Sequence, residues 1–175
     1  MGCINLSLAN PGILIFLIYL PPILFALDAS FRKKFFKVHK SKTGSLVDVL
    51  IGLIYFLIII YAATLTLSKT FLTFTAGTII YLIGLTITFM GYHTFFTSEK
   101  IIQKFPYNFS RNPTYFFGLV AILGITIATK SLVLLILLAA QFWLTHKVIL
   151  QEEEFLTKRY KNQFKKYAKK VSRYF

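Results

Sequence analysis

The stretch KFPYNFSRNPTY (residues 104–115) is a polar, turn-rich interruption between long apolar runs. Its Asn-Pro pair at 112–113 bends the backbone before a new apolar run begins, because the residue before a proline avoids the helical conformation. A second polar group, Glu152-Glu153-Glu154, follows the apolar hairpin at residues 116–150. If both arms of that hairpin cross a membrane, Arg111 and the glutamates return to the same side. The two motifs then face one cavity.

The composition is that of a small membrane protein. The chain is 56% hydrophobic and 15% charged, and its mean hydropathy is +0.66, which is rare for a soluble domain. The net charge is +14, but the cations flank the apolar runs, which favours anionic membrane lipids over nucleic acid as the partner. The lone Cys3 excludes an internal disulfide framework, and we expect no metal site. No basic region precedes the first apolar run, so we expect no cleaved signal peptide.

Five apolar runs predict an all-α polytopic protein with about five transmembrane helices in one domain, residues 1–175. The predicted spans are approximately residues 11–27, 46–67, 74–96, 114–129 and 132–150. The fourth run is short, so a re-entrant segment is the alternative there. Residues 151–171 follow as an amphipathic helix with an aromatic stripe and basic flanks, expected to lie in the membrane interface. A helix packed on a cytosolic partner is the alternative.

The basic residues give the orientation. Segments 32–42, 97–113 and 147–175 contain 6, 3 and 9 Lys or Arg, and Lys69 and Lys130 are the only others. By the positive-inside rule the first three segments are cytosolic and the N-terminus is outside. The candidate site therefore faces the cytosol.

Glycines recur every seventh residue in the third run, at Gly77, Gly84 and Gly91. Small residues at this spacing suit close contact between two helices. A glycine-rich helix face without such a contact is the alternative.

The three glutamates cannot share one role, because consecutive residues on a helix point about 100° apart. Glu154 has Lys158 four residues later, the favourable order for an ion pair within a helix. Glu153 continues the face that carries Trp143, His146 and Leu150. Glu152 and Glu153 are therefore the candidates for a polar pocket, with a solvated acidic face as the alternative.

Arg111 is either an interface cation extending to the head groups or a two-pronged clamp for a carboxylate. Tyr92 and His93, at the end of the third span, can line the same cavity, although a lone histidine there is more often structural. No P-loop, glycine-rich nucleotide loop, nucleophile triad or zinc-spaced ligand set occurs. These residues predict a polar cavity for a zwitterionic or anionic ligand and name no reaction.

The two motifs resemble those of the isoprenylcysteine carboxyl methyltransferase and phospholipid methyltransferase group of membrane enzymes. The segment Tyr107…Arg111-Asn112-Pro113-Thr114-Tyr115…Gly118 is close to that family's Arg-His-Pro-x-Tyr-x-x-Gly. The segment Glu152-Glu153-x-x-Leu156 matches its Glu-Glu-x-x-Leu, and the ending Tyr160…Tyr167…Val171-Ser172-Arg173 is also similar. The resemblance covers roughly residues 75–175 and leaves the first two spans unmatched.

The resemblance implies a methyltransferase that uses S-adenosylmethionine, in a pocket that opens laterally to lipid. It implies Arg111 and Glu153 as the catalytic residues that position the substrate. The implied cofactor-binding residues are Lys100, Ile101, Ile102, Tyr107, Asn112, Pro113, Thr114, Tyr115 and Glu152. The implied acceptor is a membrane-embedded or lipid-like molecule, methylated at an isoprenylcysteine carboxylate or at a phospholipid or amine nitrogen. The membrane would be the plasma membrane of a prokaryote or the endoplasmic reticulum of a eukaryote, and no obligate protein partner is inferred.

The sequence departs from the family pattern at three positions, which leaves the acceptor open. Asn112 replaces the usual histidine, Phe105 replaces a glycine, and Val148 stands where the isoprenylcysteine branch has a substrate-binding arginine. Two other functions remain alternatives: an NADPH-dependent enzyme similar to the sterol reductases, and a non-catalytic scaffold of the same fold.

Overall fold

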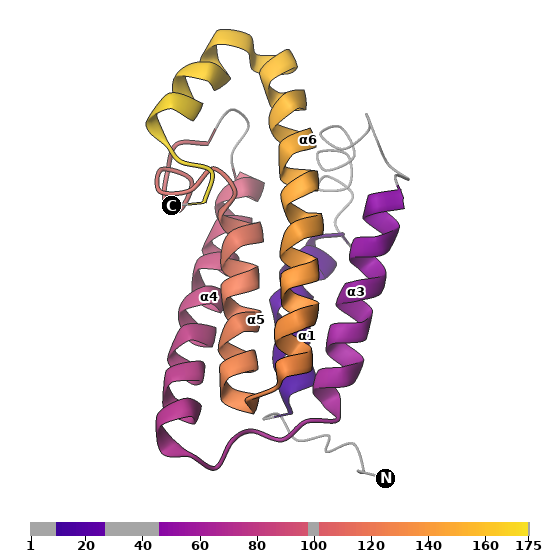
Figure 1. Ribbon diagram of the computed structural model, residues 1–175. Coiled ribbons are helices and arrows are strands. Elements are labelled where there is room, and N and C mark those ends of the chain that lie inside the picture. The colour runs from indigo at the N-terminus through magenta and orange to yellow at the C-terminus, as the bar shows by residue number, and fades with distance from the viewer. Residues whose placement is uncertain (1–9, 27–45, 98–101, 175) are drawn as a thin grey trace.

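The computed structural model describes residues 10–26, 46–97 and 102–174, and all regular structure in them is helical. The helices are α1 (Pro11–Ala26), α3 (Leu46–Ala63), α4 (Phe71–Thr97), α5 (Pro113–Thr129) and α6 (Leu132–Lys170). They run alternately up and down a single bundle (Figure 1). The loop at 102–112 and the end of α6 lie at one end of it, and the turns at 64–70 and 130–131 lie at the other. The predicted all-α class is confirmed.

Two of these helices are long and apolar enough to cross a membrane, namely α4 and α6. The other three contain shorter apolar stretches, at Pro11–Leu20, Val49–Ala63 and Pro113–Thr129. Large apolar side chains such as Phe56 and Ile136, 61% and 62% exposed, lie on the outside of the bundle, as lipid-facing residues do. The count of five spans stays a prediction.

The helix boundaries differ from the predicted spans by a few residues. Helix α4 begins at Phe71, ahead of the predicted residue 74, and α3 ends at Ala63, ahead of residue 67. The turn after α3 is closed by backbone bonds from Thr64 to Tyr61 (3.1 Å) and from Leu65 to Ala62 (3.0 Å). These three-residue bonds tighten the last turn, which is how many helices end.

Helices α4 and α5 make the most extensive contact in the bundle, and it runs along the three glycines of α4. A Cβ atom at Gly84 would lie 2.5 Å from the backbone nitrogen of Ala121, and one at Gly77 would lie 2.6 Å from the carbonyl oxygen of Gly124. At Gly91 it would lie 2.8 Å from the Cγ2 atom of Thr114. The predicted close helix contact is confirmed, and the contact between Gly91 and Thr114 positions the start of α5.

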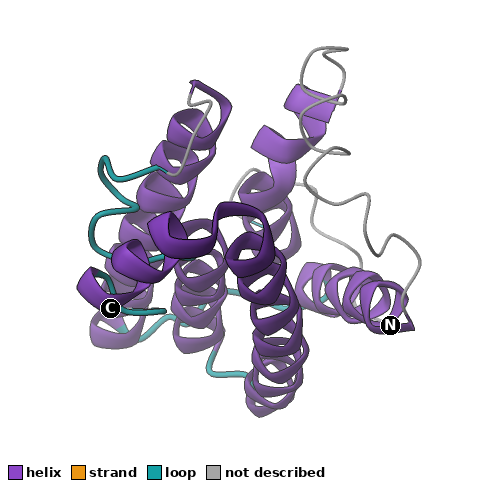
Figure 2. Ribbon diagram, turned by 90° about the horizontal axis from the view of Figure 1, so that it is seen from above, coloured by secondary structure: helices purple, strands orange, loops and turns teal. Residues whose placement is uncertain are grey.

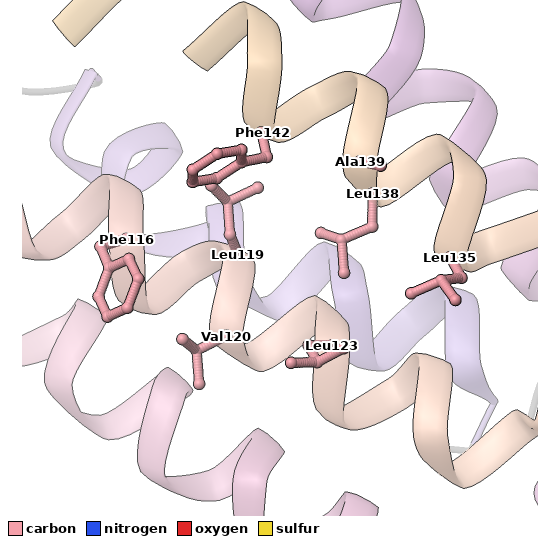
Figure 3. Close-up of a pocket in the computed structure, with 8 residues that line it drawn as sticks. All are labelled: Phe116, Leu119, Val120, Leu123, Leu135, Leu138, Ala139 and Phe142. Carbon is pink, nitrogen blue, oxygen red and sulfur yellow. The ribbon is translucent and has the colours of Figure 1, made fainter. Parts of the chain in front are cut away.

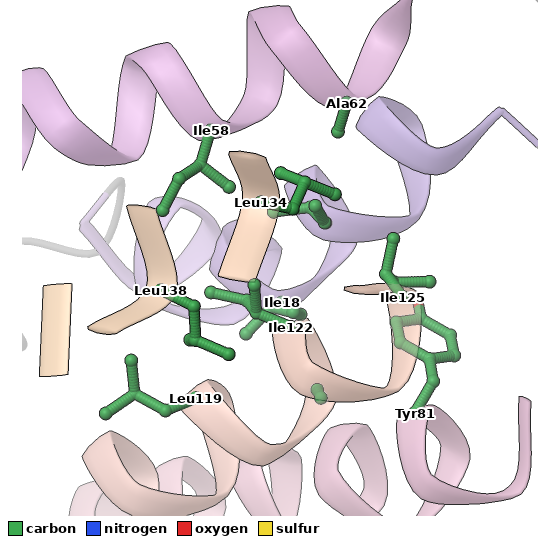
Figure 4. Close-up of a cluster of buried hydrophobic side chains, with 11 residues drawn as sticks. Ile18, Ile58, Ala62, Tyr81, Leu119, Ile122, Ile125, Leu134 and Leu138 are labelled. Carbon is green, nitrogen blue, oxygen red and sulfur yellow. The ribbon is translucent and has the colours of Figure 1, made fainter. Parts of the chain in front are cut away.

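The apolar core lies where all five helices meet (Figure 4). It consists of Ile15, Ile18, Ile58, Ala62, Tyr81, Leu119, Ala121, Ile122, Ile125, Leu134 and Leu138. Tyr81 fits because its hydroxyl donates a hydrogen bond of 2.8 Å to the carbonyl of Leu14. The core sits away from the polar end of the bundle and leaves that end to the two motifs.

The separate helix predicted over residues 151–171 does not exist as such. Helix α6 continues without interruption through the glutamates and breaks at Lys161, whose backbone has φ 45° and ψ −119°. No glycine or proline occurs between Leu132 and Lys170 to end it sooner. Beyond the break the chain folds back over the end of the bundle (yellow in Figure 1). Its aromatic face is partly taken up by the protein itself, since Phe164 and Tyr167 are buried.

Candidate functional site

The loop before α5 is a compact pair of turns. The backbone nitrogens of Tyr107 and Asn108 donate to the carbonyl of Lys104, and that of Ser110 donates to the carbonyl of Pro106. The hydroxyl of Tyr167, beyond the break in α6, donates to the carbonyl of Tyr107 at 2.7 Å. Burial raises the pKa of the Tyr167 phenol, so it stays protonated and able to donate. The tail of the chain thus holds this loop in place.

Asn112 connects the two sequence motifs. It precedes α5, where Pro113 occupies the first helical position, a place that tolerates the missing N–H of proline. Its side chain does not cap the helix and instead donates 3.2 Å to the Oε1 atom of Glu153 and 3.4 Å to the carbonyl of Arg173. The predicted juxtaposition of residues 111–115 with the glutamates is therefore present in the fold.

Glu153 is shared by two arginines. Arg173 contacts both carboxylate oxygens from its Nε atom (3.2 Å each) and donates a shorter bond of 2.9 Å from Nη2 to Oε2. Arg111 makes a single ion pair of 3.4 Å from its Nε atom to Oε1. The hydrogen bond to Glu153 raises the pKa of the Arg173 guanidinium. Arg111 was predicted to be either an interface cation or a two-pronged clamp for a carboxylate, and it makes one ion pair with Glu153. The two-pronged contact with Glu153 comes from Arg173, because the tail folds back to the glutamate.

The last residues of the described chain form a strap across this site. The carbonyl of Ser172 accepts 3.0 Å from the backbone nitrogen of Arg111, and that of Arg173 accepts 3.2 Å from the hydroxyl of Ser110. Tyr174 pairs its hydroxyl with the Nδ1 atom of His146. Sequence reasoning missed this role, for which the only signal was the resemblance of the ending at 171–173.

Glu152 lies in different surroundings from Glu153. The hydroxyl of Tyr115 donates to its Oε1 atom at 2.8 Å. The phenols of Tyr92 and Tyr107 interact electrostatically with the same carboxylate. Burial raises the pKa of Tyr107 well above its usual range. His93, one position after Tyr92, is exposed.

The remaining candidate residues divide as follows. Glu154 pairs with Lys158 at 2.6 Å on an exposed helix face, as predicted. Pro113 is buried, and Thr114 and Ile102 are half-buried. Lys100 and Ile101 lie outside the described residues.

Helix α6 has two neighbouring faces that carry polar side chains, and one glutamate lies on each of them. Gln141, Thr145 and Glu152 are spaced by four and seven residues and share a face. His146 and Glu153, seven residues apart, share the next one, about 100° away. Gln141 and Thr145 are only 0% and 2% exposed. Sequence reasoning missed both, although polar residues at helical spacing in an apolar run were the available signal.

An apolar groove of about 300 Å³ runs between α5 and α6 (Figure 3). It is lined by Phe116, Leu119, Val120, Leu123, Leu135, Leu138, Ala139 and Phe142. The rings of Phe116 and Phe142 lie 5.7 and 5.8 Å from that of Tyr174. Tyr174, the residue after Arg173, therefore packs against the part of the groove that Phe116 and Phe142 line.

A comparison with protein families matches residues 47–163 to the family described as phospholipid methyltransferase. The match covers about two thirds of the chain and includes both motifs. It begins within α3, earlier than the resemblance at residue 75, so the second apolar run is matched after all. Comparisons with curated proteins and with solved structures gave no match.

Proposed function

Because the chain belongs to the phospholipid methyltransferase family, we propose that it transfers a methyl group from S-adenosylmethionine to a lipid-like acceptor in the membrane. The observation that supports the proposal most directly is that the two family motifs, residues 107–118 and 152–156, contact each other at one end of the bundle. Tyr115 bonds Glu152, and Asn112 bonds Glu153.

The Glu152 side is suited to the methyl donor. S-adenosylmethionine carries a sulfonium, an ammonium group and ribose hydroxyls, all of which interact favourably with a carboxylate. Tyrosine rings attract such cations through their π faces, and Tyr92, Tyr107 and Tyr115 surround this carboxylate. The residues present therefore fit the donor, and Glu152 with these tyrosines would hold it.

The Glu153 side is suited to the acceptor. Arg173 directly precedes Tyr174, whose ring contacts Phe116 and Phe142 of the apolar groove, and Arg111 and Arg173 both pair with Glu153. A hydrocarbon chain in the groove would place a polar end group near Tyr174 and His146, whose pairing closes that end. This arrangement would select an acceptor with one polar end and an apolar chain.

The bound donor supplies the electrophilic methyl group. The protein's part is to hold the accepting atom in line with that methyl and to exclude water, which together lower the barrier substantially. A carboxylate acceptor reacts as it is at neutral pH, whereas an ammonium acceptor must first lose a proton. The acceptor is open between these two classes, O-methylation and N-methylation.

The proposal includes five membrane spans, with α1, α3 and α5 as short spans beside α4 and α6. Residues 102–112 and 151–174 lie at one end of the bundle, and we propose from the distribution of Lys and Arg that this end faces the cytosol. The strongly basic tail would then meet anionic head groups, with membrane lipids as its partner.

Titration of purified full-length protein in detergent with S-adenosylmethionine, by calorimetry, tests the proposal. We expect saturable binding, with a heat that disappears when the site is first filled with S-adenosylhomocysteine. A parallel titration with NADPH is the control for a reductase. Binding of NADPH alone would replace the methyltransferase proposal with the reductase alternative, and binding of neither would leave the scaffold.

A further inference from the structure

We propose that the bundle contains a second ligand site, built from Gln141, Thr145, Tyr55 and Tyr19, that binds the hydroxyl group of an otherwise apolar molecule. The four residues come from α6, α3 and α1. The site is separate from the apolar groove, which lies between α5 and α6. It does not depend on methyl transfer.

The site lies deep in the apolar part of the bundle. Gln141 is nine residues into α6, which places it about 13 Å along the helix axis. In a hydrocarbon core about 30 Å thick this is near the middle. A polar side chain that is 0% exposed at this depth needs hydrogen-bond partners, because water does not supply them there.

Those partners are incomplete. The amide nitrogen of Gln141 donates 3.4 Å to the hydroxyl of Thr145 on the same helix, but its Oε1 atom has no hydrogen-bond partner among the described residues. The buried hydroxyl of Tyr19 also has none there. The Tyr19 ring packs edge-on against Tyr55 at 4.5 Å, and the Tyr55 hydroxyl lies beside Gln141 and Thr145. An unmet hydrogen bond in an apolar interior costs on the order of 1–3 kcal/mol.

Two other buried polar groups of this bundle also join helices, and the hydrogen bonds that do so are complete. Asn10 donates 3.0 Å to the carbonyl of Ala63, and Tyr81 donates 2.8 Å to that of Leu14. Both bonds join α3 or α4 to the first helix and its entry. Gln141 and Thr145 also hydrogen-bond the Tyr55 hydroxyl of α3, but the carbonyl oxygen of Gln141 has no partner among the described residues, so it is left available to a molecule that enters the cluster.

The unmet groups define the ligand. The carbonyl oxygen of Gln141 requires a hydrogen-bond donor, and the Tyr19 hydroxyl can either donate or accept. A charged donor is disfavoured at this depth, whereas a neutral hydroxyl can donate to the carbonyl oxygen of Gln141. Tyr19 and Tyr55 are only half-buried, and we propose that the ligand enters past these two rings. A long-chain alcohol or a phenol with an apolar tail is the chemical class that fits.

Photocrosslinking of the full chain in lipid nanodiscs tests this site. The probe is geranylgeraniol that carries a diazirine, and the competitors are unlabelled geranylgeraniol and its methyl ether, which keeps the oxygen but cannot donate. We expect labelling of peptides from α1, α3 or α6, and competition by the alcohol roughly tenfold stronger than by the ether. Equal competition by alcohol and ether on the wild-type protein would overturn the proposal.

Three variants locate the site. Gln141→Leu and Tyr19→Phe should each abolish the preference for the alcohol while the protein still binds S-adenosylmethionine, if wild type does. Thr126→Val is the matched control, since this buried hydroxyl bonds the Ile122 carbonyl of its own helix. The preference should survive there. If it also survives in Gln141→Leu and Tyr19→Phe, the cluster is structural and the proposal is wrong.

Discussion

Arg173 donates hydrogen bonds to the carboxylate of Glu153 from two nitrogens, whereas Arg111 forms one ion pair of 3.4 Å with the same carboxylate. Glu153 is mostly buried, with 12% of its side chain exposed. A charge in that position needs a close partner, because removing one partner of a buried pair leaves an uncompensated charge. The tail of the chain supplies the closer of the two partners.

Arg173→Lys should therefore destabilise the protein more than Arg111→Lys. Lysine keeps the charge but loses the planar fork, so we expect a loss on the order of 1–3 kcal/mol for Arg173→Lys and less for Arg111→Lys. Thermal unfolding in detergent measures both. Arg159→Lys is the control, because Arg159 is exposed and lies over the rings of Phe155 and Tyr160. A larger loss at Arg111 would show that the two-pronged pair with Glu153 matters less than the single one.

Glu152 and Glu154 should differ sharply in their effect on donor binding. Glu152→Gln removes a charge-assisted interaction worth about 1.5–3 kcal/mol, or roughly 10- to 150-fold in the affinity for S-adenosylmethionine. Glu154→Gln removes an exposed pair with Lys158, of a kind that contributes little, and should leave the affinity unchanged within about twofold. Calorimetry on both variants decides. Equal small effects would mean that Glu152 does not contact the donor.

Tyr115 should act through Glu152. Tyr115→Phe removes the 2.8 Å hydrogen bond to that carboxylate, and we expect donor affinity to fall about 3- to 10-fold. In the double variant with Glu152→Gln the two effects should not add, because both remove one shared interaction. Strict additivity would show that the tyrosine and the glutamate act on the donor separately.

Much of this fold could be predicted because apolar run length and proline position dictate it. Asn112-Pro113 marks the start of α5, and the glycines of α4 mark its close contact with α5. The Glu154–Lys158 pair also followed from spacing alone. In each case the interaction lies within one helix or along a single helix face.

The features that could not be predicted from the sequence depend on contacts between distant segments. No glycine or proline marks the break at Lys161, although this break allows Arg173 to contact Glu153. Gln141 and Thr145 appeared as ordinary polar residues in an apolar run, because their burial depends on how α1 and α3 pack against α6. No local pattern encodes these placements.

The glycine contact between α4 and α5 gives a stability prediction with an internal control. At Gly84 an added methyl group would meet the backbone of Ala121 at 2.5 Å, whereas at Gly52 nothing lies within 4 Å. Gly84→Ala should lower the unfolding free energy by about 1–3 kcal/mol, and Gly52→Ala should raise it by up to about 1 kcal/mol, the usual gain of alanine over glycine in a helix. Thermal unfolding in the same detergent compares them. A stable Gly84→Ala protein would mean that the two helices are able to separate.

The five-span topology predicts which ends of the helices meet the cytosol. The turns that contain Lys69 and Lys130 lie at the end of the bundle opposite Ser172, and all three residues are exposed. In a Cys3→Ser background, Lys69→Cys and Lys130→Cys should react with a membrane-impermeant thiol reagent added to intact cells, while Ser172→Cys should react only after the cells are opened. The reason is the excess of Lys and Arg in 147–175, which retains that segment in the cytosol. Labelling of Ser172→Cys in intact cells would place Glu152 and Glu153 on the outer face, where cytosolic S-adenosylmethionine does not reach them.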